Sequence, residues 1–538
     1  MDRLRRFARL ARRPAARLPV EDLWRTVDYQ RVVLAVVRTV TTGTRLLDVL
    51  LLLRTDPRIQ IVFTFERSSA FTPGVTRFIR DIGAEVKPWR EAVHREYSLA
   101  ISASENGALH ELSAPLLLLP HGAGHSKYAK GTRTVSGYNP RRLVHNGRIV
   151  PRALVLSHRE QVDQLARSCP AAVPRAVVAR DVCLDRLLAS LPHRARYLRA
   201  LGNTGQRLVA VSSTWGRTSL FGQDAGLARR LLHELPRDEY QVAFILHPNV
   251  WAEHSRYEVL GWLSSALAAG LLVIPPEDGW RAVLAAADLL VGDHGSLSLY
   301  AAAIGVPVLL AAFDGTEIVE GTPMAELGLR APRLGRGPLR GQVESALRQN
   351  TAPLRAIADR AFASDAPGLR ELLYDLIGLD PPDDAPAQHV EDPVPQRRHV
   401  EAHRVVTRVV DATTVALERF SASLPGQAAG ADQHFAVEDD TFDLGLVHQA
   451  AVLIARHRPD DFAEWAGDVF AEHPTVRVAA ADRQVWHRSW SRPRLVTGDA
   501  ALAASALCAL VARHPDFAGD ALTVVLGDRK IHLRFVTA

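Results

Sequence analysis

The sequence contains few cysteines, and their spacing excludes the structures that cysteine usually supports. Only three occur in 538 residues: Cys169, Cys183 and Cys508. No two of them stand in a CxxC spacing. They provide neither a disulfide framework nor a zinc signature. We therefore expect a protein of a reducing compartment, the cytoplasm, with no metal site.

The sequence also lacks an uninterrupted apolar run. The most apolar stretch, residues 32–53, contains Arg38, Arg45 and Asp48 and has no small-residue cleavage site after it. It is a poor membrane span and a poor signal peptide. The basic segment 1–29, with its arginines at roughly helical spacing, has two interpretations. It is either a frayed end or a peripheral contact with anionic lipid on the inner face of the membrane.

The chain carries only a small excess of positive over negative charge for its length. The net charge is +6 and the isoelectric point is about 9.4. So small an excess suits a phosphate-bearing ligand as well as a nucleic acid, so composition alone does not choose the partner. We do not expect a nucleic acid partner.

Short apolar strands alternate with amphipathic helices from about residue 31 onward, a pattern typical of α/β domains with parallel sheets. The pattern runs through two series, which predict two Rossmann-like domains that face each other across a cleft. The predicted parts are a basic N-terminal segment (1–29), a first Rossmann-like domain (30–200), a second Rossmann-like domain (201–378), a proline-rich linker (379–399) and an accessory module (400–538).

The accessory module is predicted to have an α+β fold. Its front half shows the periodicity of amphipathic helices, and Gly527 and Asp528 between alternating strands indicate a hairpin. Trp486 and Trp490 stand among arginines. That pattern fits either a polyanion or membrane contact or two aromatic rings packed under a loop.

The first polar cluster follows the apolar run 116–119. It contains His121, Gly122, His125 and Lys127. Glycine lets the backbone approach a ligand, histidine exchanges a proton near neutral pH, and lysine pairs with phosphate. These residue types within seven positions favour a binding or catalytic loop.

Two further clusters follow strands of the second series. Ser213, Thr214 and Arg217 offer hydroxyls and a guanidinium to a phosphate, although a helix N-cap would need only one of the hydroxyls. His247 and Asn249 follow the next strand, and such a histidine would contact a phosphate or polarise the reacting centre.

The fourth cluster lies in the segment 290–313, where a buried strand runs into a polar turn, an Ala-rich helix and a second strand. Its members are Asp293, His294, Gly295, Ser296 and Ser298. Glycine permits a tight turn, and the free amides at the start of the helix favour an anion. A single N-cap would not explain all of these residues together.

The four clusters, taken in order, resemble the CDP-glycerol glycerophosphotransferase family of teichoic acid polymerases, which have the GT-B fold. The resemblance covers about residues 30–375. It implies that His121 is the base that activates the acceptor hydroxyl and that His247 acts at the donor phosphate. It further implies that the donor phosphates lie on Ser213, Thr214, Arg217, Asp293, His294, Gly295, Ser296 and Ser298. The first domain would then face the acceptor and the second the nucleotide.

A second resemblance is to the UDP-N-acetylglucosamine 2-epimerases, on residues 305–328. It implies that Glu317 or Glu320 contacts a nucleotide sugar. Glu105 is the nearest candidate for the acid or base of that reaction. His294 stands where the first family usually has tyrosine, which leaves the identity of the donor open.

The favoured reaction is a direct displacement at phosphorus, with a CDP-alcohol as substrate and no cofactor. The acceptor would be a hydroxylated polymer or a lipid-linked acceptor of cell-wall synthesis. Two alternatives stay open. The first is an NDP-sugar glycosyltransferase or UDP-sugar 2-epimerase-like enzyme on the same fold, and the second is a non-catalytic GT-B-like binding protein.

Overall fold

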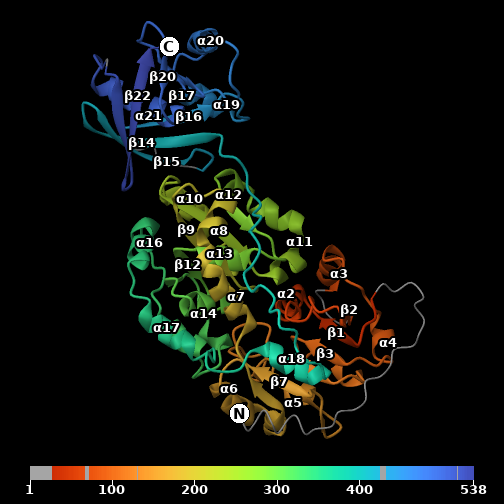
Figure 1. The fold of residues 1–538 in the computed structure, drawn as a ribbon. Helices are drawn as coiled ribbons and strands as arrows, with labels where there is room; N and C mark the ends of the chain where they lie inside the picture. Colours follow the sequence, from red (N-terminus) through yellow and green to blue (C-terminus); the bar gives the residue numbers. More distant parts are fainter. Residues whose placement is uncertain (1–26, 67–71, 130, 425–431, 518, 538) are drawn as a thin grey trace.

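The computed structural model describes residues 27–66, 72–129, 131–424, 432–517 and 519–537. It has three parts: two α/β domains that lie against each other and a β-barrel at one end of the molecule, beyond α10 and α12 (Figure 1). The basic segment lies almost wholly outside the described residues. Within them, no helix is both long enough and apolar enough to cross a membrane.

The first domain has a six-stranded parallel sheet in the order β2-β1-β3-β4-β7-β8. Its four inner strands are almost entirely buried, as expected where helices cover both faces, and the edge strands are less so. They are β1 (Arg31–Val37), β2 (Ile59–Phe65), β3 (Leu99–Ser102), β4 (Leu116–Leu118), β7 (Ala153–Leu156) and β8 (Ala176–Val178). A small hairpin joins β5 (Val144–His145) to β6 (Arg148–Ile149). The helices are α2 (Val40–Leu50), α3 (Thr72–Asp81), α4 (Trp89–Ala92), α5 (Pro140–Leu143), α6 (Glu160–Ser168), α7 (Val182–Ser190) and α8 (Arg194–Ala200).

The second domain has a five-stranded parallel sheet in the order β11-β10-β9-β12-β13. The strands are β9 (Arg207–Ser213), β10 (Tyr240–Leu246), β11 (Leu272–Ile274), β12 (Leu289–Gly292) and β13 (Val308–Leu310). The helices are α9 (Leu220–Gln223), α10 (Leu227–Glu234), α11 (Pro248–Trp262), α12 (Ser264–Ala268), α13 (Trp280–Ala286), α14 (Ser296–Ala303), α15 (Pro323–Arg330), α16 (Leu339–Leu347) and α17 (Ala352–Asp359). The two Rossmann-like domains are thereby confirmed.

The chain order in the second sheet reverses between the neighbouring strands β9 and β12. Ligands of open α/β sheets bind beyond the carboxyl ends of the strands at such a reversal. The predicted clusters after β9 and β12 therefore stand side by side. Two later segments pack back across the molecule. Helix α18 (Leu369–Ile377) joins the core of the first domain, and the linker pairs Gln396 with Val273 at the edge of the second sheet.

The accessory module is a closed nine-stranded barrel, so the predicted α+β fold is wrong. The order is β14-β15-β21-β22-β20-β19-β18-β17-β16. The strands are β14 (Ala402–Asp411), β15 (Thr414–Ser421), β16 (Gln433–Glu438), β17 (Ala450–Ile454), β18 (Val478–Ala481), β19 (Gln484–His487), β20 (Arg494–Val496), β21 (Ala521–Leu526) and β22 (Arg529–Thr537). Helices α19 (Leu444–Gln449), α20 (Phe462–Glu472) and α21 (Ala500–Arg513) complete it.

The error has a physical cause. Residues 442–458, part of the front half that the periodicity predicts to be helical, divide into α19 and the strand β17, because a short apolar run does not distinguish a strand from a helix. Helix α21 is apolar on nearly every side and shares a core with residues of all nine strands. The hairpin at Gly527 is confirmed, since β21 pairs with β22 in antiparallel register. Trp490 packs against Phe535 of the barrel core, and the indole of Trp486 donates to the Trp490 carbonyl oxygen.

Candidate functional site

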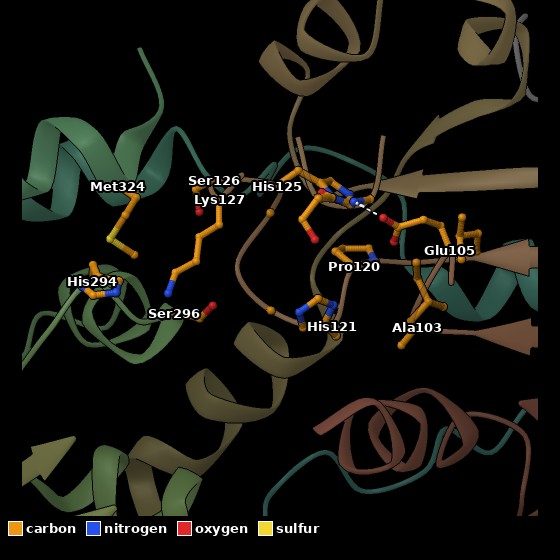
Figure 2. Close-up of a pocket in the computed structure, with 16 residues that line it drawn as sticks. Ala103, Glu105, Pro120, His121, His125, Ser126, Lys127, His294, Ser296 and Met324 are labelled. Atoms are coloured by element: carbon orange, nitrogen blue, oxygen red, sulfur yellow. Dashed lines mark hydrogen bonds between the residues drawn. The ribbon is translucent and has the colours of Figure 1, made fainter. Parts of the chain in front are cut away.

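A pocket lies where the loop after β4 meets the turn between β12 and α14 (Figure 2). Both Rossmann-like domains line it. The first domain contributes Ala103, Glu105, Leu118, Leu119, Pro120, His121, Gly122, Gly124, His125, Ser126, Lys127, Ser136 and Gly137, and the second contributes His294, Ser296 and Met324. The structure therefore brings together the first and fourth clusters predicted from the sequence.

Direct hydrogen bonds join the two domains at this pocket. The Ala123 amide donates to Ser296 Oγ at 3.1 Å. A β-carbon added at Gly122 would lie 2.5 Å from the same oxygen, which explains the glycine. Further along, the Tyr128 amide donates to the Glu317 carbonyl oxygen, so the loop also pairs edge to edge with the second domain.

His121 is exposed to the cleft, although protein surrounds it. The backbone just before His121 is held in place by Arg45, whose Nε donates to the Pro120 carbonyl oxygen at 3.1 Å. Arg45 itself is held by Asp181 at 2.6 Å. Burial lowers the pKa of His121 below its ordinary value, although the Glu105 carboxylate opposes this shift. The imidazole is therefore neutral at pH 7 and able to accept a proton.

His125 and Glu105 support the loop. His125 Nδ1 donates to the Ser136 carbonyl oxygen at 2.9 Å, and its ring packs on Tyr138 at 4.2 Å. Glu105 accepts from the Gly137 amide at 2.7 Å, the dashed line in Figure 2. Burial lowers the pKa of His125 to about 4. The Nε2 atom of this neutral ring finds no hydrogen-bond partner among the described residues.

His247 forms the N-cap of α11. Its Nδ1 atom accepts from the Asn249 amide at 3.1 Å, which leaves the proton of the neutral ring on Nε2. Burial, with the charge of Lys127 and the neighbouring His121, lowers the pKa of His247 to about 3. The ring therefore offers a hydrogen bond and no charge at neutral pH. Trp215 packs near it, with ring centroids 6.4 Å apart.

His294 is completely buried beneath the turn. Its Nε2 atom lies 3.5 Å from Glu317 Oε2, and Glu317 Oε1 accepts from the Thr218 hydroxyl at 2.8 Å. Burial is the first cause that lowers the pKa of His294, and Lys127 is the second. The neutral His294 ring forms no ion pair, and its Nε2 atom has no hydrogen-bond partner among the described residues, so Glu317 is positioned at the edge of the site by Thr218.

Lys127 extends from the first domain toward Ser296 and His294 of the second (Figure 2). Burial lowers the pKa of its ammonium group, while Asp293 and Glu317 raise it. Among the residues that the structure describes, no carboxylate lies within ion-pairing distance of it. A lysine so placed has its charge available for a ligand.

The sequence predicts that Asp293 lies at the donor phosphate, but in the structure its carboxylate is occupied by hydrogen bonds from the protein. It is 1% exposed, and its carboxylate accepts from the Thr214 amide and hydroxyl, both at 2.7 Å, and from the Leu220 and Gly295 amides, both at 3.0 Å. Ser298 donates to the Asp293 carbonyl oxygen at 2.6 Å. Asp293 thereby joins the loop after β9 to the turn after β12.

The hydroxyl of Ser213 is engaged in the same way. It donates to the Thr214 carbonyl oxygen and accepts from the Phe221 amide, both at 2.9 Å. Arg217 and Glu320 are exposed and do not line the pocket. A phosphate contact by any of these side chains stays a prediction. The structure itself gives Ser213 and Thr214 a role in shaping the loop.

Replacing Asp293 with alanine is expected to lower the free energy of unfolding by about 2–3 kcal/mol, because it leaves buried amide donors without acceptors. Urea denaturation measures this loss. The control is Asp359→Ala, which removes an exposed carboxylate from α17 of the same domain and should change stability by less than about 0.5 kcal/mol. Equal losses in the two variants would show that Asp293 does not join the loops.

Sequence reasoning missed several residues of the site. Glu105 entered only as a candidate of the epimerase resemblance, although it follows β3 as the other clusters follow their strands. Ser136 and Gly137 lie in a loop with no strand before it, so no sequence signal marks them. Within the described part of the chain, no group of three histidine, cysteine or carboxylate side chains could hold a metal ion.

No family model and no curated protein sequence matches this chain. Several solved structures resemble it. The wall teichoic acid polymerase TagF is 12% identical, over 65% of this chain and 89% of that chain, with a TM-score of 0.43. Anabaena Alr3699/HepE, solved with UDP and glucose, is 13% identical, over 65% and 96%, with a TM-score of 0.36. MnaA of S. aureus, solved with UDP, is 9% identical, over 66% and 99%, with a TM-score of 0.38. Likeness at this level carries no conclusion about what this chain binds or catalyses.

Proposed function

We propose that this protein is a transferase of the GT-B type that moves a polyol-phosphate unit from a CDP-activated donor to a hydroxyl acceptor. One observation carries the proposal. The neutral His121 of the first domain opens into a pocket that also holds the half-buried Lys127 and the N-terminus of α14 from the second domain. A proton acceptor next to an anion site that spans two domains suits phosphoryl transfer.

In this mechanism the donor pyrophosphate lies between Lys127 and the free amides at the start of α14. His121 takes the proton of the acceptor hydroxyl as its oxygen forms a bond to the phosphorus that carries the polyol. The bond from that phosphorus to the bridging oxygen breaks, and CMP leaves with the electron pair. His247, a neutral Nε2–H donor, stabilises charge on the phosphoryl oxygens.

An NDP-sugar donor is the second candidate, and one observation favours it. Glu317 is held at the edge of the site by the Thr218 hydroxyl, where its carboxylate could accept hydrogen bonds from ribose or sugar hydroxyls. In that reaction His121 would again take the proton of the acceptor hydroxyl, but the hydroxyl oxygen would form its new bond to a carbon of the sugar and not to phosphorus. The acceptor that we propose is a hydroxylated polymer or a lipid-linked hydroxyl, which would bring the enzyme to the membrane surface.

Titration calorimetry of the full chain with CDP-glycerol, CMP, UDP, UDP-glucose and GDP tests the donor. We expect cytidine nucleotides to bind and Lys127→Gln to weaken them at least about tenfold, because it removes one charge-assisted contact. Lys87→Gln is the matched control, since Lys87 pairs with Glu85 away from the pocket. Binding of uridine nucleotides alone would favour the sugar donor, and no binding of any nucleotide would overturn both candidates.

A further inference from the structure

A second cavity lies at the junction of the barrel and the second Rossmann-like domain, on the side of the barrel that faces α10 (Figure 1). The barrel and the segment before it supply most of its wall, and the loop between α10 and β10 closes it. The lining residues are Arg237, His399, Val400, His403, Arg419, Ala436, Glu438, Ile454, Ala501 and Ser505. None of them belongs to the site described above.

The barrel places charged side chains in its own interior at this end. Side chains alternate along a strand, so Arg419 shares the inward face of β15 with the buried Leu417, and His403 shares that of β14 with Val405. An inward charge needs a partner. For Arg419 that partner is Asp238 of the second domain, at 2.6 and 2.8 Å.

The other charged groups of the cavity are only partly paired with one another. Glu438 is paired with His399 at 2.7 Å and with Arg456 at 2.9 Å. Arg237 contacts His403 Nε2, which must accept the hydrogen bond because arginine only donates. Within the described ranges, no carboxylate lies within ion-pairing distance of Arg237. Arg237 is partly open to solvent, and the charges of Asp238 and Glu438 oppose the lowering of its pKa by burial. Its guanidinium nevertheless forms no ion pair among the described residues and can donate to a bound oxyanion.

Helix α21 contributes a further polar group. Ser505 is 1% exposed, it lines the cavity, and its hydroxyl has no hydrogen-bond partner among the described residues. A buried hydroxyl without a partner is costly unless a ligand satisfies it. Ala501 brings the first turn of the same helix to the wall. The Asp499 carboxylate caps that turn by accepting from the Leu502 amide at 3.0 Å, so the helix end itself offers no anion site. Val400, Ala436 and Ile454 make the other side apolar.

We propose that this cavity binds a small organic anion, with a carboxylate or phosphate group on a short aliphatic body. The oxyanion lies between Arg237 and the Ser505 hydroxyl, and the aliphatic part lies against the apolar side. The cavity measures about 200 Å³, below the roughly 300–1,000 Å³ of sites for drug-sized ligands, so we expect its occupant to be small. Because both the barrel and the second domain supply contacts, the ligand also stabilises their junction.

Titration calorimetry of the full chain with butyrate and with inorganic phosphate, at constant ionic strength and without nucleotide, tests the proposal. Arg237→Gln is expected to weaken binding at least about tenfold and Ser505→Ala about threefold. Arg229→Gln is the matched control, because it removes an exposed arginine from α10 that does not line the cavity, and it should bind as the wild type does. Phosphate is also titrated into Lys127→Gln, so that binding at the donor site is told apart from binding here.

Each outcome has a clear meaning. Binding of butyrate that depends on Arg237 and Ser505 supports a carboxylate ligand, and phosphate binding that persists in Lys127→Gln but is lost in Arg237→Gln supports a phosphate ligand. Ser505→Ala should fold at least as stably as the wild type, since it removes an unsatisfied hydroxyl, so a loss of affinity cannot be ascribed to unfolding. Absence of binding by both probes, or equal affinity in all variants, would overturn the proposal.

Discussion

His121→Ala is expected to lower kcat by about 10²–10⁴-fold, the usual contribution of a positioned general base. Nucleotide affinity should change little, because the proposed donor contacts are Lys127 and the amides of α14. Nucleotide titration therefore doubles as proof that the variant is folded. His94→Ala is the matched control, since His94 is an exposed histidine of the first domain that does not line the pocket. Unchanged turnover in His121→Ala would exclude His121 as the base.

The dependence of kcat/KM on pH is a second test of His121 as the base. Burial lowers the pKa of His121 below its ordinary value of 6.5, so the neutral, active form predominates at pH 7. Protonation removes the base, so kcat/KM should fall as the pH drops through this lowered pKa and should form a plateau above it. An acidic limb with a midpoint above 6.5 would contradict the assignment.

Asp48→Ala is expected to lower the free energy of unfolding by about 3–5 kcal/mol, the largest stability effect that the structure predicts. Asp48, in α2, is fully buried and pairs with Arg186 of α7 and with Arg281 of α13 in the second domain. Burial alone would lower the pKa of Arg281, but the Asp48 carboxylate more than offsets it and raises that pKa. Without Asp48 the buried Arg281, at the contact between the domains, keeps only a longer pair with Asp278 at 3.7 Å. The partly buried Arg186 keeps only a hydrogen bond to the Gln388 carbonyl oxygen.

Urea denaturation of the full chain measures the loss. The control is Asp81→Ala, which breaks an exposed pair with Arg77 on α3 and should cost less than about 1 kcal/mol. A loss for Asp48→Ala no larger than for Asp81→Ala would show that water reaches the buried pairs. Because the pairs join α2 to α13, the variant should also become more sensitive to proteolysis between the domains.

Local sequence predicted the α/β domains well because their signals are local. Buried parallel strands appear as apolar runs such as Arg31–Val37, and a helix such as α18 ends at a glycine, Gly378. The barrel was missed for the same reason. Closure of nine strands depends on pairings such as β14 with β16 and β15 with β21, which join residues far apart in the chain and leave no short-range pattern.

The candidate site shows the same division between features visible in the sequence and features that depend on the tertiary structure. The sequence by itself determined that polar clusters follow β4, β9, β10 and β12, since strand ends and glycines are visible in the order of residues. Only the tertiary structure decided their roles. It turned Asp293 inward, because four donors from two loops converge on its carboxylate, and it left His121 open to the cleft with a lowered pKa, because both domains surround it. Hydrogen-bond convergence and desolvation depend on neighbours in space, which the order of residues does not contain.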